Sequence, residues 1–298
     1  MEALPDLDNL ETYKADKSRL GQALERLPQD APTPEERFPP PYGVVGFGEG
    51  WWPAELLRDR FPDTLARGTT FVLAGGYDHG KLAGLLAAAR EESERVVVLG
   101  FGPEAEVKIP SSPLSPYRYL RYLLLATGEL ELAQSLEAAL KAELERTAPY
   151  VPSQENPAKL LAWSFLERTP LWVASERYPM LAQALQQVFA RVGKSLSIAP
   201  PPAALEFFIT ALEARHEQGD PLVAVTLGTD EEIELAKEVL ATRVDYLEEL
   251  DPPKAKGPLP EALAYWYRLA WAAYYLALLY RKDPGDHEVL ARLREAAS

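Results

Sequence analysis

Short apolar runs alternate with amphipathic stretches along most of the chain. The apolar runs are continuous, which is typical of strands covered by helices on both faces of a parallel sheet. In the first half they predict strands at 44–47, 70–74 and 95–99, a short strand near residue 107, and helices at 54–61, 81–92 and 130–150. Strands and helices that alternate in this way form parallel sheets with helical crossovers.

The same alternation returns in the second half of the chain. It predicts strands at 171–174, 195–198, 222–226 and 244–246, and helices at 180–192, 204–214 and 230–240. A long apolar helix at 261–280 and a last helix at about 286–297 follow, with Asp230 and Asp286 as expected N-caps. The expected fold class is therefore α/β, with two doubly wound domains, each a parallel sheet flanked by helices, plus C-terminal helices.

Changes in composition indicate the domain limits. Residues 1–42 include the stretch LPQDAPTPEERFPPPY, whose prolines and charges exclude a central strand or a long helix, so they are expected to form an N-terminal arm. The first domain is expected at 43–150 and the second at 151–258. Residues 259–298 are expected to form helices that pack on both domains.

Charge and composition narrow the classes of partner. The 298 residues carry a net charge of −14, which disfavours binding to nucleic acid or to an anionic membrane. The chain has no cysteine, and its first twenty residues lack a secretory signal, so a cytoplasmic protein is expected. The longest apolar run, 265–280, is interrupted by Arg268 and reads as a buried helix rather than a membrane span. Scarce asparagine and abundant proline, glutamate and arginine are typical of a thermophile.

Candidate chemistry begins in the stretch GVVGFGEGWWP at 43–53. It reads as a strand, a glycine turn and a helix, but its glycines do not have the G-x-G-x-x-G spacing of a dinucleotide site. The three histidines are too far apart in the sequence to form a recognisable metal-ligand motif, so no metal is expected. His79 and Lys81, in GGYDHGK, either hold an anion or belong to a solvated turn. Glu206 is either a base in an apolar setting or an ordinary first-turn glutamate, and His216 reads as a helix C-cap.

Several stretches, taken in order, resemble the bifunctional phosphoglucose/phosphomannose isomerase family, which is built from two sugar isomerase (SIS) domains. NPAKLLAWSFLERTPLWVAS at 156–175 is similar to that family's entry into the second domain, and YYLALLYRKDPGDHEVLARLR at 274–294 to its closing segment. AALEFF at 203–208 falls where the family carries N-H-N-E. GFGEGWWPAELLRD at 46–59 takes the place of the family's first glycine loop.

The resemblance implies interconversion of an aldose phosphate and a ketose phosphate through an enediol, without metal or cofactor. Glu206 then matches the base, His216 the ring-opening histidine contributed by a neighbouring subunit, and Arg294 the closing lysine. The resemblance therefore also implies a homodimer with shared active sites. The residues expected to contact the substrate and its phosphate are Gly48, Glu49, Gly50, Tyr77, His79, Lys81 and Arg118.

The sequence also departs from the family in its phosphate loops. Glu49 adds a negative charge beside the expected phosphate, and the loop at 76–81 has lost the serine and threonine side chains of the family. Two hypotheses follow. The protein is an isomerase of glucose-6-phosphate, mannose-6-phosphate and fructose-6-phosphate with a rebuilt phosphate site, or it is a catalytically degenerate SIS-fold protein that binds a sugar phosphate or has a regulatory role.

Overall fold

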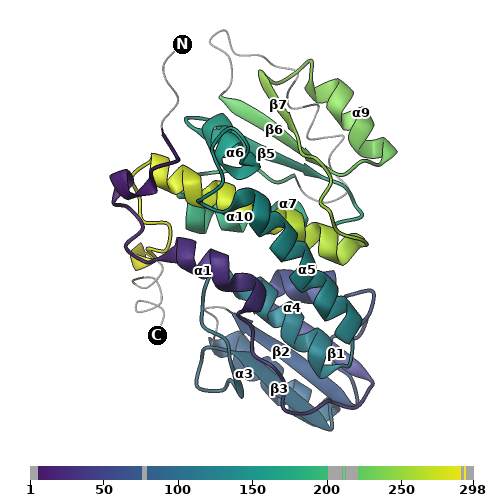
Figure 1. Cartoon of the computed structure of the whole chain (residues 1–298). Helices are drawn as coiled ribbons and strands as arrows, with labels where there is room; N and C mark the ends of the chain where they lie inside the picture. Colours follow the sequence, from purple (N-terminus) through teal and green to yellow (C-terminus); the bar gives the residue numbers. More distant parts are fainter. Residues whose placement is uncertain are drawn as a thin grey trace. The chain divides into compact units, whose positions relative to one another are not determined.

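The structure is a computed structural model that describes residues 6–75, 79–200, 210, 212, 221–289 and 292 (Figure 1). The chain divides into two compact units. The described residues of unit 1 fall within Met1–Glu25 and Ala138–Asp286, and those of unit 2 within Arg26–Glu137 and His287–Ser298. Two of the three limits between the units fall inside helices, α1 (Leu20–Arg26) and α5 (Leu130–Thr147), and the third lies between Asp286 and His287. The domain limits expected from composition, at 43–150 and 151–258, remain a prediction.

Unit 2 contains a parallel sheet whose described strands follow the order β1-β2-β3-β4. Its strands are β1 (Tyr42–Gly48), β2 (Thr69–Gly75), β3 (Arg95–Gly100) and β4 (Val107–Lys108). Its other helices are η2 (Leu27–Gln29), α2 (Trp51–Leu56), α3 (His79–Glu92) and α4 (Ser115–Ala126). Figure 1 shows α3 and α4 on opposite faces of this sheet. All seven residues of β2 are buried, as expected for a strand covered on both faces.

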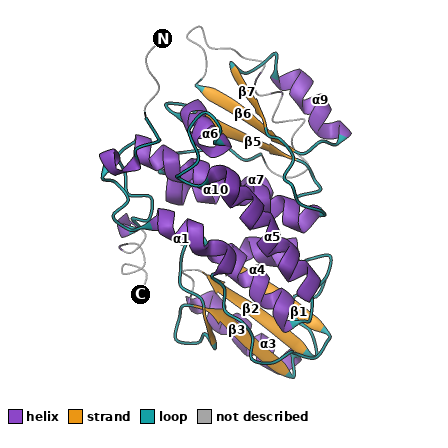
Figure 2. Ribbon diagram, in the orientation of Figure 1, coloured by secondary structure: helices purple, strands orange, loops and turns teal. Residues whose placement is uncertain are grey.

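Unit 1 contains a second parallel sheet, in the order β5-β6-β7 (Figure 2). Its strands are β5 (Thr169–Ala174), β6 (Leu222–Leu227) and β7 (Tyr246–Glu249). Its helices, apart from α1 and α5, are η1 (Leu10–Tyr13), α6 (Pro157–Phe165), α7 (Leu181–Val188), η3 (Phe189–Gly193), α9 (Glu231–Leu240) and α10 (Pro258–Leu279). Helix α9 packs its Ile233, Ala236 and Leu240 against one face of the sheet.

A single bridge gives the sheet of unit 1 its doubly wound topology. Ile198 pairs with Leu171 on the edge of β5 opposite to β6. The segment after α7 therefore lies along one edge of β5, and β6 lies along the other. Ligands of open α/β sheets commonly bind at such a switch point, outside the carboxyl ends of the strands. The fold class expected from the sequence is confirmed.

The structure corrects some of the predicted elements. The strand predicted at 195–198 is reduced to the bridge at Ile198, and the strand predicted at 244–246 lies instead at Tyr246–Glu249. Helix α2 ends at Leu56 rather than at residue 61. Helix α4 was not predicted. Most of the predicted helix at 204–214 and most of the last helix lie outside the described residues.

Helix α10 is buried nearly all round, with 19 residues of its 22 classed as buried. It packs against α6, α7 and η3 of the same unit. Its apolar circumference is therefore explained within the chain, and it provides no argument for a dimer. No helix in the described part of the chain is long and apolar enough to cross a membrane.

Candidate functional site

The turn between β1 and α2 is built by glycines. Gly48 has a φ of 52°, a left-handed conformation that favours glycine, and a Cβ on Gly50 would collide with the carbonyl oxygen of Leu73. The amide of Glu49 donates to the carbonyl of Gly75 at 2.9 Å, which ties the turn to the carboxyl end of β2. The glycines are therefore explained by the close approach of two strand ends, without a bound nucleotide.

Glu49 is buried in this turn, with only 7% of its surface exposed. The hydroxyl of Ser111 donates to its Oε1 at 2.8 Å, so the carboxylate is joined to the loop that precedes α4. Tyr119 of α4 is fully buried, and burial, followed by the negative charge of Glu49, raises the pKa of its hydroxyl. An additional anion at this position would meet a like charge in a poorly solvated setting.

Ser111 and Tyr119 are the site neighbours that sequence reasoning missed. Both lie near the start of α4, in the stretch SSPLSPYRYL, whose prolines read as a loop. Pro116 is compatible with the helix because it stands in the first turn, where a backbone N–H is not needed. The serine-rich stretch before α4 was the available signal.

The second predicted loop is described only in part. Strand β2 ends at Gly75, and helix α3 begins at His79. Tyr77 lies outside the described residues, and the side chains of His79 and Lys81 are not described. Their expected contact with phosphate therefore remains a prediction.

Arg118 has a well-defined partner within unit 2. Its Nη2 lies 2.6 Å from Oδ2 of Asp30, and its Nε donates to the carbonyl of Asp30 at 3.3 Å. Arg118 is 9% exposed, so its guanidinium holds the segment before β1 against α4. This geometry gives the residue a structural function, and its predicted role in phosphate binding remains a prediction.

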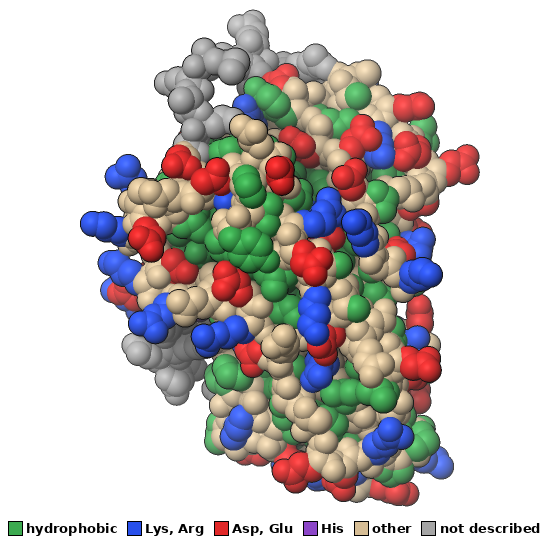
Figure 3. Space-filling view, viewed as in Figure 1, with side chains coloured by type: hydrophobic (Ala, Val, Ile, Leu, Met, Phe, Trp, Pro, Cys, Tyr) green, Lys and Arg blue, Asp and Glu red, His purple; other side chains and the backbone are tan. Residues whose placement is uncertain are grey.

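The three predicted catalytic residues, Glu206, His216 and Arg294, lie outside the described residues. In the sequence, Glu206 and His216 lie between Ile198, which bridges to β5, and the start of β6. Among the described residues, no group of His, Asp and Glu side chains could hold a metal ion. On the face drawn in Figure 3, Lys and Arg side chains are interspersed with Asp and Glu.

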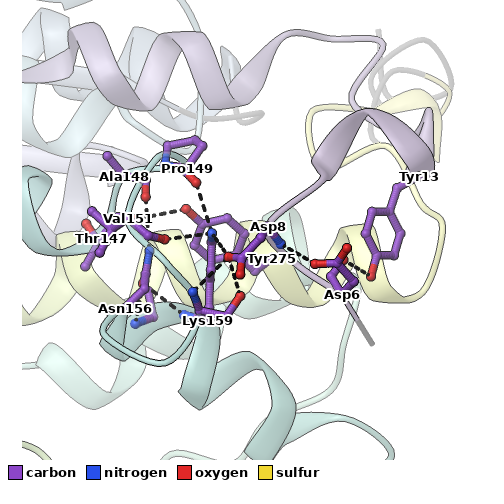
Figure 4. Close-up of polar contacts among 12 residues, drawn as sticks. Asp6, Asp8, Tyr13, Thr147, Ala148, Pro149, Val151, Asn156, Lys159 and Tyr275 are labelled. Atoms are coloured by element: carbon purple, nitrogen blue, oxygen red, sulfur yellow. Dashed lines mark hydrogen bonds and ion pairs between the residues drawn. The ribbon is translucent and has the colours of Figure 1, made fainter. Parts of the chain in front are cut away.

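The NPAK stretch, quoted above for its resemblance, forms a buried polar network in unit 1 (Figure 4). Asn156 caps α6 by accepting from the amides of Ala158 at 3.0 Å and Lys159 at 3.1 Å, and it donates to the carbonyl of Ala148 at 3.1 Å. The Nζ of Lys159, fully buried, donates to Oδ1 of Asp8 at 2.9 Å and to two backbone carbonyls. The motif therefore fixes the start of α6 and anchors the N-terminal segment.

Two parallel sheets, each flanked by helices, and a family match to a SIS domain place the protein in the SIS class. Residues 20–128 match the family Phosphoglucose isomerase N-terminal domain, and residues 154–296 match the family Bacterial phospho-glucose isomerase C-terminal SIS domain. The structure of a glucose-6-phosphate isomerase like protein from Thermus thermophilus is 50% identical, covers 99% of this chain and 100% of that chain, and has a TM-score of 0.90. The chain belongs to the phosphoglucose isomerase family of SIS-domain proteins.

More distant structures share the fold. A hypothetical protein, also from Thermus thermophilus, is 15% identical, with a TM-score of 0.60 over 97% of this chain and 90% of that one. Glucosamine-6-phosphate deaminase from Thermotoga maritima is 12% identical, with a TM-score of 0.55 over 94% of both chains. No curated protein sequence matches the chain.

Proposed function

We propose that the protein interconverts glucose-6-phosphate or mannose-6-phosphate with fructose-6-phosphate. The observation that carries the proposal is the 50% identity, over nearly the whole chain, to a protein described as glucose-6-phosphate isomerase like. Membership of the family supports a sugar-phosphate isomerase in general. The particular substrates are part of the proposal, because a fold does not determine an activity.

In the proposed mechanism Glu206 is the base. Its carboxylate removes the proton from C2 of the open-chain aldose, and the electron pair forms the C1–C2 double bond of the enediol while O1 gains a proton. The same carboxylate then returns a proton to C1 while O2 loses its proton, which gives the ketose. His216 assists opening of the sugar ring by moving a proton between the ring oxygen and the C1 hydroxyl. Arg294 stabilises the negative charge that develops on the oxygen in the transition state.

The phosphate is proposed to lie at the second loop rather than the first. Glu49 is a buried anion that already accepts the hydroxyl of Ser111, and it disfavours a phosphate beside Gly48 and Gly50. The first loop then contacts the uncharged part of the sugar. Tyr77, His79 and Lys81 supply the phosphate contacts, with the N-terminus of α3 as a source of backbone donors.

A coupled assay tests this function. Formation of glucose-6-phosphate from fructose-6-phosphate is followed at the elevated temperature that the composition indicates, for the wild type, Glu206→Gln and Glu238→Gln. Glu238, on the exposed surface of α9, is a control for the loss of one charge. Turnover in the wild type and in Glu238→Gln, with a loss of about 1,000-fold or more in Glu206→Gln, is expected. Normal turnover in Glu206→Gln would refute the assignment of the base.

The second candidate function is a SIS-fold protein that binds a sugar phosphate, or has a regulatory role, without isomerising its ligand. The observation that favours it is the buried pair of Glu49 and Ser111. Calorimetric titration with fructose-6-phosphate separates the two functions, since binding without turnover supports the second. If Glu49 excludes phosphate, Glu49→Gln should bind fructose-6-phosphate more tightly than the wild type. The proposed homodimer is tested separately by light scattering coupled to size-exclusion chromatography.

A further inference from the structure

Unit 2 contains a pocket of about 280 Å³ on the face of the sheet that α3 covers. Its floor consists of Phe47, Ala74 and Val98, one residue from each of β1, β2 and β3. Helix α3 and the loop at 101–105 supply the remaining walls. We propose that this pocket binds a neutral, planar aromatic molecule about the size of two fused rings. The proposed site is separate in residues and in chemistry from the proposed sugar-phosphate site.

Small side chains keep this pocket open. Ala74 at the floor, Ala83 on α3 and Ala105 in the loop all line it, together with Gly102. Protein interiors are normally packed with few voids larger than a water molecule, so the core between a sheet and a helix usually carries larger side chains at such positions. The pocket is therefore a property of the sequence, with alanine and glycine where leucine or valine would fill the space.

The apolar part of the lining disfavours a sugar phosphate and favours an apolar ring. Phe47, Leu82, Leu86 and Val98 present hydrocarbon to the pocket, and a phosphate or a row of hydroxyls there would lose its hydrogen bonds to water without replacement. A cavity of roughly 150 Å³ lined by such side chains accommodates benzene. The present volume is nearly twice that value, which corresponds to a bicyclic molecule such as indole.

Two charged side chains among the lining residues give the ligand an orientation. Arg90 and Glu104 form an ion pair at 3.5 Å, and both are more than half exposed, at 61% and 54%. A carboxylate accepts an N–H donor at the edge of a heterocycle, and a guanidinium lies favourably over an aromatic face. Phe101, which also lines the pocket and is 37% exposed, offers a second aromatic surface. Ligand pockets typically combine such apolar walls with a few polar groups.

Calorimetric titration with indole tests the proposal on the full chain. The wild type is expected to bind one indole per chain with a dissociation constant on the order of 0.1 mM. Ala83→Trp places a large side chain at the exposed edge of the pocket and should weaken binding by about tenfold or more. Ala87→Trp makes the same change on α3 at an exposed residue that does not line the pocket, and should change the affinity by less than about twofold.

A second variant and a competition experiment complete the test. Ala105→Leu fills the pocket from the loop and should also weaken indole binding, with an unchanged circular dichroism spectrum as the check on folding. Fructose-6-phosphate should not displace indole, so a failure of the isomerase proposal leaves this one standing. The proposal is overturned if the wild type binds no indole up to about 5 mM, or if both Ala83→Trp and Ala105→Leu retain wild-type affinity.

Discussion

Replacing Glu143 by glutamine removes the counter-ion of a buried arginine. Nε and Nη2 of Arg268 each lie 2.7 Å from a carboxylate oxygen of Glu143, and the two side chains are 2% and 1% exposed. Arg268 also donates from Nη1 to the carbonyl of Asp251 at 2.9 Å, which does not neutralise its charge. Arg146, 3.6 Å from the same carboxylate, is a second cation that would lose one of its partners and keep Asp251, at 3.8 Å.

The magnitude follows from this geometry. Removing one member of a buried, hydrogen-bonded ion pair costs about 3 to 5 kcal/mol, because a charge remains buried without compensation. Glutamine retains the shape of Glu143 and one acceptor oxygen, so the lower end of that range, about 3 kcal/mol, is expected for the free energy of unfolding. Replacing both partners, as in Glu143→Leu with Arg268→Met, should recover most of the loss, since apolar pairs of similar volume often equal a buried ion pair.

Urea unfolding followed by tryptophan fluorescence measures the effect. Glu145→Gln, at an exposed position of α5, is the control for the same change of charge on the same helix, and should shift stability by less than about 0.5 kcal/mol. A Glu143→Gln protein as stable as Glu145→Gln would refute the reasoning. So would a double variant that is less stable than Glu143→Gln alone.

Other perturbations follow from the same structure. The pKa of Asp8 is lowered, first by the hydrogen bond from Ser153 and then by the hydrogen bond from Lys159. The contribution of Asp8 to folding stability is therefore present above its ordinary pKa of 3.8 and is lost as pH falls through the lowered pKa of the folded state. Because Asp8 is 53% exposed, Asp8→Asn should cost no more than about 1 kcal/mol at pH 7, and a difference that persists at pH 2 would contradict this account. Asn156→Ala removes the cap of α6 and should cost about 1 to 2 kcal/mol in urea unfolding; a neutral result would show that the cap is not needed. Gly84→Ala should raise the melting temperature, because a Cβ at this position of α3 meets nothing within 4 Å. Gly50→Ala should lower the melting temperature, because its Cβ would collide with the backbone of Leu73. Equal shifts in the two variants would contradict both expectations.

The alternation of strands and helices could be predicted from the sequence because continuous apolar runs between amphipathic stretches leave few alternatives. The N-cap Asp230 was also predicted, and its side chain accepts from the amide of Ile233 at 3.2 Å. The misses have physical reasons. Helix α4 begins among prolines that resemble a loop, and β7 has the sequence YLEE, with both of its end residues exposed, which carries little apolar signal.

The candidate site was less predictable than the fold. The burial of Glu49 depends on a partner 62 residues away, Ser111, and no local pattern reports that contact. The same holds for Lys159, whose carboxylate partner, Asp8, is 151 residues away. Arg118 was expected to contact the substrate or its phosphate, and its pairing with Asp30 depends on tertiary contacts that spacing alone does not reveal.

Isomerisation in deuterated water tests the central claim most directly. Fructose-6-phosphate is incubated with the wild type and with Glu206→Gln, and nuclear magnetic resonance follows both its conversion to the aldose phosphate and the entry of deuterium at the carbon that receives the proton. The account predicts conversion with deuterium incorporation in the wild type, and neither in Glu206→Gln. A wild-type protein that binds fructose-6-phosphate at saturation but shows neither conversion nor exchange would contradict it.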